Sequence, residues 1–397
     1  MITSILDVDF YKLTVGAIIF KYFRGIKAKY LLTVRNGEKI DYWSYVHHSS
    51  YGRNIENLKT LSLTEAEAVY LRSLNLFEEE YIQFLSNRPM DGVDIRWEYQ
   101  GDNMYRPVPY VCGAWERAML YEIFCLSIGN EMFSYGYCSD NQINMEAVEQ
   151  TARFRLVDKI STIKEYFKKS GEKLNITEFG TRRRLSKSWQ EEVVSTLAEV
   201  GVIDCTSNVL LAMKYGLTPR GTMGHEIFMG AQGLYRIQDS QKSILDLWLH
   251  HWGDNLKIAL DDTLGTQKFL RDFTKERSRK YDGLRHDSGD WRVWAEERID
   301  MYFGHEIDPK TKTLFFSDGL DVDTIIKIHK ALSDKVNVAF GIGTNLTNDS
   351  FTPVPQVVMK IVECNGQPVC KLSNNPAKAS CVDPIYLEYV KHVADKY

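Results

Sequence analysis

Short apolar runs alternate with small polar clusters through the second half of the chain, from Lys173 to Leu346. Each run has the length of a buried strand and ends in polar residues that can open a helix. The runs are residues 174–179, 201–204, 217–219, 257–260, 283–285, 314–316 and 336–340. About seven such units are typical of a (β/α) barrel. We therefore predict an α/β fold in which the residues just past each strand share one rim.

The pattern changes on both sides of this stretch. The N-terminal part mixes helical and strand patterns, and beyond Leu346 the chain returns to strands, with a hairpin predicted within residues 357–372. We infer a discontinuous α+β domain built from residues 1–135 and 348–397. Residues 136–347 would form an irregular, barrel-like (β/α) catalytic domain.

Capping residues indicate where several helices begin. Asp9 is expected to cap a helix that runs to about Phe23. Thr64 and Ser188 each open a capping-box pattern, and Asp321 can cap the helix that follows it.

Composition and charge indicate a globular protein without a membrane segment. Of 397 residues, 44% are hydrophobic and 26% charged, and the net charge is −4. This charge argues against a nucleic-acid-binding surface over the whole molecule but allows a local basic pocket. The longest apolar run, residues 15–20, is too short to span a bilayer. Asp7 and Asp9 fall where the apolar part of a signal peptide would lie.

The seven cysteines are scattered and form no C-x-x-C pair. Such usage is typical of reduced, mostly buried thiols in a cytosolic protein. We therefore expect a cytoplasmic chain without a structural zinc site.

Two glycine-bearing loops follow strands late in the stretch. Gly341, Gly343 and Thr344 can bring backbone N–H groups and a hydroxyl close to an anion. Ser317 and Gly319 follow the preceding strand and can complete the same cradle. Each loop alone can also be an ordinary turn or helix cap. Their pairing on neighbouring strands predicts a phosphate site.

Three consecutive arginines, Arg182, Arg183 and Arg184, come directly after a predicted strand. Cations are disfavoured near the start of a helix, so an anion should offset their charge. Phosphates would do so through bidentate contacts. Phe179 and Arg182 can also present a ring face and a guanidinium to one planar ligand.

His225 stands at the head of a predicted helix, in the segment Gly221–Glu226. A lone histidine is usually a buried structural residue. Its place on the polar rim, beside Glu226 and a Gly-Thr turn, favours catalysis. An imidazole can act there as a base, or accept a phosphoryl group as a nucleophile.

The segment 285–290 brings a cation, two acids and a hydroxyl together. Asp287 and Asp290 can hold Mg²⁺, with water and substrate phosphates completing the coordination. Alternatively, Asp287 binds a ribose hydroxyl or caps the following helix, and the cap is the simpler interpretation of Asp290. Asp261 and Asp262 pose the same choice, and we interpret both as structural or supporting residues.

Taken together, these motifs resemble the nicotinate phosphoribosyltransferases, in the form typical of bacteria and fungi. The segments that carry the resemblance are residues 6–14, 178–184, 206–208, 221–226, 262–266, 285–290, 316–321, 340–349 and 362–369. They follow the family order over nearly the whole chain. Ile227, Leu264 and Trp291 depart from the residues that the family often has there, Trp, Tyr and Pro respectively. We expect these changes to affect only local packing.

The resemblance implies a reaction of NAD salvage. Nicotinate, 5-phosphoribosyl pyrophosphate, ATP and water would give nicotinate mononucleotide, pyrophosphate, ADP and phosphate. ATP would be a co-substrate, acting through a phosphohistidine, and Mg²⁺ would be required, with ligands that the resemblance leaves unknown. A homodimer with active sites at its interface is implied, because Tyr11 is reached across that interface in relatives. No nucleic-acid or membrane partner is implied.

The resemblance also assigns roles to residues by position. The expected catalytic residues are His225, Glu226, Arg285 and Asp287. The expected nicotinate-binding residues are Tyr11, Phe179, Thr222, Arg285 and Ser207. The expected phosphate- and ribose-binding residues are Arg182, Asp287, Ser317, Gly319, Gly341, Gly343 and Thr344.

The same residues argue against other functions. Nicotinamide-using relatives place an acid where Ser207 stands, and a neutral serine beside Arg285 suits an acid substrate. The Gly-Thr-x-x-His-Glu setting of His225 argues against a quinolinate enzyme, which uses no ATP. A metal-dependent hydrolase would need several converging ligands, yet His225 and His286 alone fall on the rim. A non-catalytic nucleotide sensor would not need the intact His, Arg and Asp set.

Overall fold

The computed structural model describes every residue except 1, 36, 38, 101–102 and 375–377. The chain divides into two compact units. Unit 1 comprises residues 1–25, 29–220 and 342–360, and unit 2 comprises residues 26–28, 221–341 and 361–397. No helix of the described residues is long and apolar enough to cross a membrane. The division into domains at residues 135/136 and 347/348 stays a prediction.

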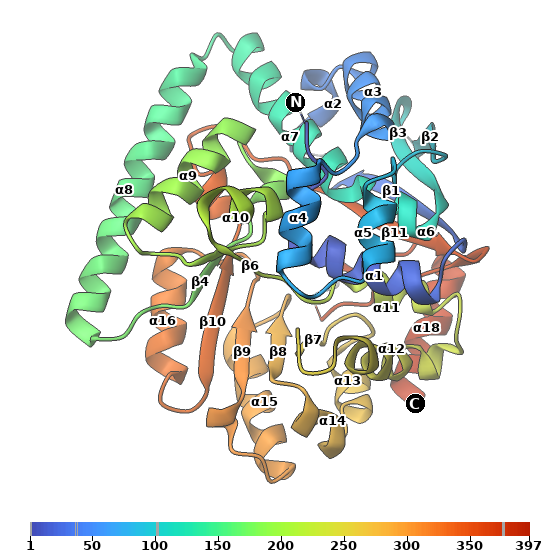
Figure 1. Cartoon of the computed structure of the whole chain (residues 1–397), viewed down its shortest axis with the longest axis vertical. Helices are drawn as coiled ribbons and strands as arrows, with labels where there is room; N and C mark the ends of the chain where they lie inside the picture. The colour runs from blue at the N-terminus through green and yellow to red at the C-terminus, as the bar shows by residue number, and fades with distance from the viewer. Residues whose placement is uncertain (1, 36, 38, 101–102, 375–377) are drawn as a thin grey trace. The chain divides into compact units, whose positions relative to one another are not determined.

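Unit 1 holds most of the helices of the N-terminal half (Figure 1). Its helices are α1 (Phe10–Tyr22), α2 (Tyr42–Tyr45), α3 (His48–Asn57), α4 (Glu65–Ser73), α5 (Glu79–Leu85), α6 (Trp115–Ala118), α7 (Tyr121–Asp140), α8 (Met145–Ser170), α9 (Lys187–Glu199), α10 (Val209–Tyr215) and α17 (Thr344–Thr347). The 3-10 helices η1 (Leu58–Thr60) and η2 (Thr181–Arg183) also belong to it. In α8, the spacing of apolar residues and a terminal glycine explain why the helix forms and where it ends. It buries Val148, Ala152, Leu156 and Ile160 at four-residue spacing and ends at Gly171 with φ +74°.

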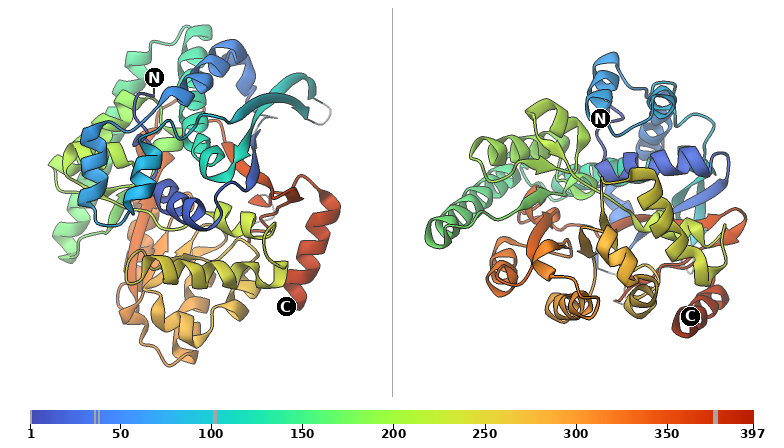
Figure 2. Two further views of the ribbon diagram at one scale, coloured as in Figure 1. Left: turned by 45° about the vertical axis from the view of Figure 1, so that its right-hand side comes forward. Right: turned by 60° about the horizontal axis from the view of Figure 1, so that its bottom comes forward.

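Unit 2 holds the helices that follow the later strands. They are α11 (His225–Ala231), α12 (Ile237–Trp252), α13 (Thr266–Asp272), α14 (Lys275–Lys280), α15 (Trp291–Gly304), η3 (Pro309–Thr311), α16 (Val322–Leu332) and α18 (Pro384–Lys396). The orange helices α15 and α16 lie together on one side of the strands of this unit (Figure 2).

Six of the seven predicted strands form at their predicted residues, and the seventh forms directly after them. Unit 2 contains β7 (Ile258–Leu260), β8 (Gly283–His286), β9 (Thr313–Phe316) and β10 (Asn337–Ile342), which pair in parallel in this order. Unit 1 contains β4 (Ile176–Glu178), β5 (Cys205–Thr206) and β6 (Thr218–Pro219), which also pair in parallel. The last residue of β10, Ile342, belongs to unit 1, where its carbonyl accepts a hydrogen bond from the N–H of Phe179.

The position of β5 corrects the sequence prediction, which placed that strand at residues 201–204. The strand begins at Cys205 instead. The backbone N–H groups of Gly201, Val202 and Ile203 bond back to carbonyls of Leu197 and Ala198 and close the last turn of α9. The residues predicted as a strand therefore form the C-terminal end of α9.

Antiparallel strands make up the other sheet. β2 (Asp94–Gln100) and β3 (Asn103–Ala114) pair antiparallel, with Asp94 opposite Cys112. β1 (Lys27–Val34) and β11 (Val357–Cys364) belong to the same sheet. β11 turns at Asn365 and Gly366, both with positive φ, into β12 (Gln367–Pro368). The predicted hairpin is confirmed, although its second strand is short.

The predicted helix starts have mixed outcomes. Thr64 forms the predicted capping box, and Asp321 accepts the predicted bond from a backbone N–H. The prediction for Ser188 is wrong. Ser186 caps α9 instead, by accepting from the N–H of Trp189. The two serines are near neighbours, and only the backbone geometry distinguishes them.

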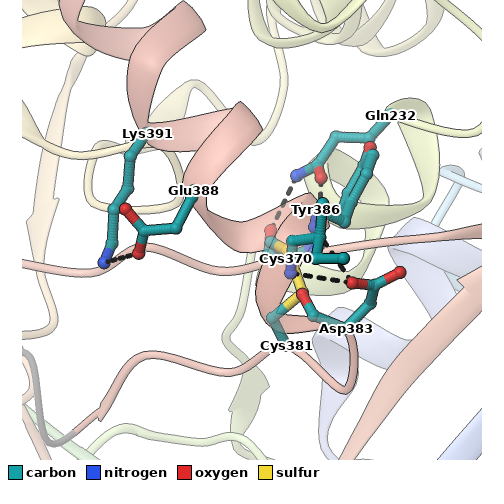
Figure 3. The surroundings of a disulfide bond; sticks show 8 residues. Gln232, Cys370, Cys381, Asp383, Tyr386, Glu388 and Lys391 are labelled. Carbon is teal, nitrogen blue, oxygen red and sulfur yellow. Dashed lines mark hydrogen bonds and ion pairs between the residues drawn. A yellow bond between two sulfur atoms is a disulfide. The ribbon is translucent and has the colours of Figure 1, made fainter.

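The prediction of reduced thiols is wrong for one cysteine pair. Cys370 and Cys381 form a disulfide, eleven residues apart in sequence (Figure 3). Cys112, Cys125, Cys138, Cys205 and Cys364 are free, and all but Cys112 are buried. Cys370 belongs to an apolar cluster with Ile237, Leu264, Val390 and Val393, against which Cys381 packs. The spacing of the pair gives no motif, so the sequence offered no signal for it.

Candidate functional site

The predicted site residues fall into two groups, one in each unit, and each group is described by itself. The group in unit 2 centres on His225, the first residue of α11. His225 Nε2 lies 2.7 Å from Asp262 Oδ1 and 3.6 Å from Asp287 Oδ2. It also lies 2.7 Å from Lys371 Nζ. One histidine, two carboxylates and an ammonium therefore meet at one point.

The two carboxylates follow neighbouring strands. Asp262 comes after β7 and is fully buried, and its Oδ2 accepts from Ser288 Oγ at 2.6 Å. Asp287 comes after β8 and accepts from Ser317 Oγ at 3.3 Å. Because the carboxyl ends of parallel strands meet at one edge, the strand-end motifs predicted this gathering for Asp287 and Ser317.

The electrostatics of this group favour a neutral imidazole between ionised acids. Burial, together with the charge of Lys371, lowers the pKa of His225 to about 4. Burial alone would raise the pKa of Asp262, but its contacts with His225 and Lys371 hold it well below the ordinary value. The pKa of Asp287 is lowered despite burial, by His225, Arg285 and Lys371. At neutral pH the imidazole therefore carries a lone pair.

Arg285 reaches the same group from β8. Its guanidinium donates to the carbonyl of Met223 at 3.0 Å and lies 3.5 Å from Asp287 Oδ1. Its Nε is buried and has no hydrogen-bond partner among the described residues. Arg285 is thus fixed beside Asp287 with its Nε donor unused.

The remaining predicted residues of unit 2 lie in the segments around this group. Thr222 Oγ1 donates to the carbonyl of Ile258 at 2.9 Å. Glu226 is buried in the first turn of α11. Gly319 follows β9 and has φ +62°, a conformation that favours glycine. Gly341 lies within β10.

Two questions that the sequence left open receive structural answers. Asp290 caps α15 by accepting from the N–H groups of Arg292 and Val293. Asp261 is buried and accepts from the side chains of Trp294 and Arg298. Both residues therefore have structural roles.

Asp262 and Lys371 contact His225. Sequence reasoning interpreted Asp262 as a structural or supporting residue and missed Lys371. The signal for Asp262 was present, since it follows a strand like the other candidates. The sequence contains no such signal for Lys371, because this residue lies in the C-terminal tail, outside the strand–turn pattern. His286, the other rim histidine, is buried between Trp294 and Phe316, and neither ring nitrogen has a partner among the described residues.

In unit 1, Ser207 and Asp9 form a buried polar contact. Ser207 Oγ donates to Asp9 Oδ1 at 2.7 Å. Asp9 therefore does not cap α1 with its side chain, which corrects the prediction, although the helix forms as expected. Burial raises the pKa of Asp9, while the bond from Ser207 and the charge of Arg182 oppose the rise.

Glu178, at the end of β4, is a further buried acid of unit 1. Its carboxylate accepts from Thr206 Oγ1 at 2.6 Å and from Gln190 Nε2 at 3.1 Å. Burial raises its pKa to about 7, an effect that these hydrogen bonds only partly oppose.

The loop after β10 lies against the segment after β4. A Cβ atom at Gly343 would come within 2.9 Å of the carbonyl oxygen of Phe179, so only glycine fits there. Thr344 opens α17, and Thr347 of that helix donates to the carbonyl of Gly180. Phe179 is partly exposed beside this loop.

The three consecutive arginines, 182–184, have different environments in the structure. Arg184 is buried, and its guanidinium forms a bidentate pair with Asp7, at 2.7 and 3.0 Å. The anion that offsets this arginine is therefore a carboxylate of the protein, which corrects the expectation of phosphate for this residue. Arg183 lies near the carbonyl of Val357, whereas Arg182 is exposed.

Tyr11 lies on α1 and is partly exposed. Its hydroxyl donates to Glu122 Oε1 at 3.4 Å. Glu122 also pairs with the buried ammonium of Lys12 at 2.5 Å. Tyr11 thus belongs to a fixed polar group with Glu122 and Lys12.

Comparison with known families gives two matches. The model of the nicotinate phosphoribosyltransferase (NAPRTase) family matches residues 174–396, and the model of the NAPRTase N-terminal domain matches residues 6–130. Among curated relatives, nicotinate phosphoribosyltransferase of Ralstonia pickettii (strain 12J) is 38% identical over 399 residues, covering 99% of each chain. That of Bordetella bronchiseptica (strain RB50) is 38% identical over 398 residues, covering 99% of this chain and 95% of the relative.

Solved structures of similar proteins share the fold. The crystal structure of nicotinate phosphoribosyltransferase from Vibrio cholerae has a TM-score of 0.89 at 31% identity, covering 100% of this chain and 94% of that one. The crystal structure of that from Porphyromonas gingivalis has a TM-score of 0.85 at 27% identity, covering 100% of both chains. The predicted fold class, an irregular (β/α) barrel with a second α+β domain, is confirmed by this likeness.

Proposed function

This chain belongs to the nicotinate phosphoribosyltransferase family, and from that premise we propose that it couples phosphoribosyl transfer to ATP through a phosphohistidine at His225. Transfer of a phosphoribosyl group to nicotinate is the activity that the family and the full-length relatives support. The donor would be 5-phosphoribosyl pyrophosphate, and the products nicotinate mononucleotide and pyrophosphate. ATP and water would give ADP and phosphate.

The observation that carries the proposal is the contact between His225 Nε2 and Asp262 Oδ1, at 2.7 Å. We propose the tautomer in which Nε2 donates its proton to Asp262 and the lone pair lies on Nδ1, while the Lys371 ammonium pairs with the carboxylates of Asp262 and Asp287 rather than donating to the ring. Nδ1 has no hydrogen-bond partner among the described residues. In the proposed step Nδ1 attacks the γ-phosphorus of ATP, a P–N bond replaces the P–O bond to the β-phosphate, and ADP leaves.

The other predicted residues would bind and orient the substrates. Asp287 would bind the ribose, and Arg285 would pair with the carboxylate of nicotinate. We propose Phe179 and Tyr11 for contacts with the pyridine ring, and Ser207 for discrimination between nicotinate and nicotinamide.

Phosphate binding is proposed for residues of both late loops. The left-handed conformation of Gly319 and the tight approach of Gly343 to Phe179 support a backbone cradle near Ser317 and Thr344, respectively. Arg182, which is exposed, would contact substrate phosphates. Positive groups at these phosphates would stabilise the leaving pyrophosphate as the ribosyl centre gains positive charge.

Mg²⁺ is expected to enter with the substrate phosphates rather than to reside in the protein. His225, Asp262 and Asp287 form the group of the described residues that could hold a metal ion. This group does not fit a resident divalent ion, because Lys371 Nζ already lies 2.9 Å from Asp262 Oδ2 and 2.7 Å from His225 Nε2.

The assembly and the location of the protein are also proposed from the family. We propose a homodimer with active sites at the subunit interface, acting in the cytoplasm. Light scattering on the purified protein at several concentrations tests the dimer, and a monomer at every concentration would exclude it.

The experiment that tests the proposed function measures transfer of the γ-phosphoryl label of ATP to the protein. The wild type, incubated with [γ-³²P]ATP, should take up acid-labile label and form more nicotinate mononucleotide than it does without ATP. His225→Ala should take up no label and lose the ATP-dependent part of the rate. His286→Ala is the matched control and should retain the label, because the His286 ring lies between Trp294 and Phe316 and neither of its nitrogens has a hydrogen-bond partner among the described residues. Label retained by His225→Ala would show that a residue other than His225 is phosphorylated.

A further inference from the structure

The ammonium of Lys371 lies at the centre of the His225 group. Its Nζ is 2.7 Å from His225 Nε2, 2.9 Å from Asp262 Oδ2 and 3.6 Å from Asp287 Oδ2. The side chain is 2% exposed. Those three partners are the residues that could hold a metal ion among the part of the chain that the structure describes. The ammonium therefore stands where a divalent ion would bind.

The charges of the group require a cation at this point. Asp262 is fully buried, and Asp287 keeps only 22% of its side chain exposed. Arg285 lies near Asp287 alone, at 3.5 Å. Lys371 is within ion-pair distance of both acids. Because a buried carboxylate without a counter-charge is costly, the lysine supplies the positive charge that a metal would otherwise bring.

The backbone around Lys371 is held independently of its side chain. Lys371 and Ser380 exchange two backbone hydrogen bonds, at 2.8 and 2.9 Å. The N–H of Leu372 donates to the carbonyl of Thr263, next to Asp262, at 2.8 Å. Gln232 binds both the N–H and the carbonyl of Cys370, at 2.9 and 2.7 Å (Figure 3). The ammonium is therefore delivered by a fixed segment, and a change of this side chain leaves that segment anchored.

We propose that Lys371 is a positioning residue that takes the place of a divalent ion, balancing Asp262 and Asp287 and keeping metal ions off His225. An imidazole flanked by two carboxylates is a good ligand for transition metals, and a bound metal would fix the ring and compete for its charge partners. The ammonium prevents this while adding no ligand to the ring. In this role no bond to Lys371 forms or breaks. The benefit to phosphoryl transfer rests on the proposed function, whereas the exclusion of metal does not.

The experiment measures binding of Mn²⁺ alone, by electron paramagnetic resonance, to the full-length protein without nucleotide or nicotinate. Lys371→Met keeps the length of the side chain and removes its charge. We expect this variant to gain one Mn²⁺ site per chain, with a Kd at least about tenfold lower than any wild-type binding that depends on Asp262. The site should vanish in the double variant Lys371→Met, Asp262→Asn. Lys371→Arg, which restores a cation, should bind Mn²⁺ no better than the wild type.

Two outcomes would overturn the proposal. One is a wild type that binds Mn²⁺ as tightly as Lys371→Met, with loss of the site in Asp262→Asn. The other is a folded Lys371→Met variant that gains no Mn²⁺. If that variant does not fold, the wild type and Asp262→Asn still test the proposal. The proposal requires both to bind Mn²⁺ equally weakly, so tighter binding by the wild type would overturn it. Failure of the proposed function would appear separately, as a wild type that makes no nicotinate mononucleotide.

Discussion

Replacing Glu178 by glutamine removes a carboxyl group whose protonation differs between the folded and the unfolded chain. Glu178 is fully buried and accepts hydrogen bonds from Thr206, Gln190 and the N–H of Gly180. Burial raises its pKa from 4.5 to about 7, and the nearby Asp9 adds to the rise. Glutamine has nearly the same shape and can keep the acceptor contacts of one oxygen, but it cannot titrate.

The size and sign of the effect follow from the two pKa values. The folded pKa is about 7 and the ordinary value is 4.5, a difference of about 2.5 units. At 1.36 kcal/mol per unit, this shift corresponds to about 3 kcal/mol. Because the folded pKa is raised, the contribution of Glu178 to stability is fully present below pH 4.5. It is lost as the pH rises through 7.

The assay is urea unfolding of wild type and Glu178→Gln at a series of pH values from 4.5 to 8. The free energy of unfolding of the wild type, minus that of the variant, should fall by about 3 kcal/mol over this range. Glu199→Gln, at an exposed position on α9, is the matched control and should follow the wild type within about 0.5 kcal/mol at every pH. Parallel curves for wild type and Glu178→Gln would refute the reasoning, because they would show that the buried carboxyl does not hold its proton.

Two further predictions concern selectivity and the disulfide. Ser207→Asp should shift the ratio of kcat/KM values towards nicotinamide by about tenfold or more, since a carboxylate repels that of nicotinate. Ser207→Ala, which loses the bond to Asp9 without adding charge, should keep the wild-type preference, and an unchanged ratio in Ser207→Asp would contradict the assigned role. Cys381→Ser should lower the free energy of unfolding by about 3 kcal/mol, the loop-closure contribution of a bridge that spans eleven residues. Dithiothreitol should bring the wild type to the same value, and a wild type insensitive to it would show that the bridge does not form.

The strands and the polar residues at their ends could be predicted because one pattern specifies both. A buried strand must end where polar residues begin, so Asp287 and Ser317 were found together with β8 and β9. The same reasoning located His225 at the start of α11.

Contacts between distant segments could not be predicted. Nothing in the tail marks Lys371 as the residue that meets His225, because a lysine there has the same local pattern as a surface lysine. Asp9 has the residue type and position of a helix cap. Its carboxylate instead accepts a hydrogen bond from Ser207, which is distant in sequence. The disulfide of Cys370 likewise depends on the path of the chain and not on spacing.

The bidentate pair of Asp7 with Arg184 makes the beginning of the described chain part of the interior of unit 1. A deletion that reached Asp7 would strand a buried guanidinium, at a cost of about 3–5 kcal/mol. A fusion partner attached ahead of an intact Asp7 should therefore leave unit 1 stable, whereas one joined to a chain trimmed past Asp7 should not.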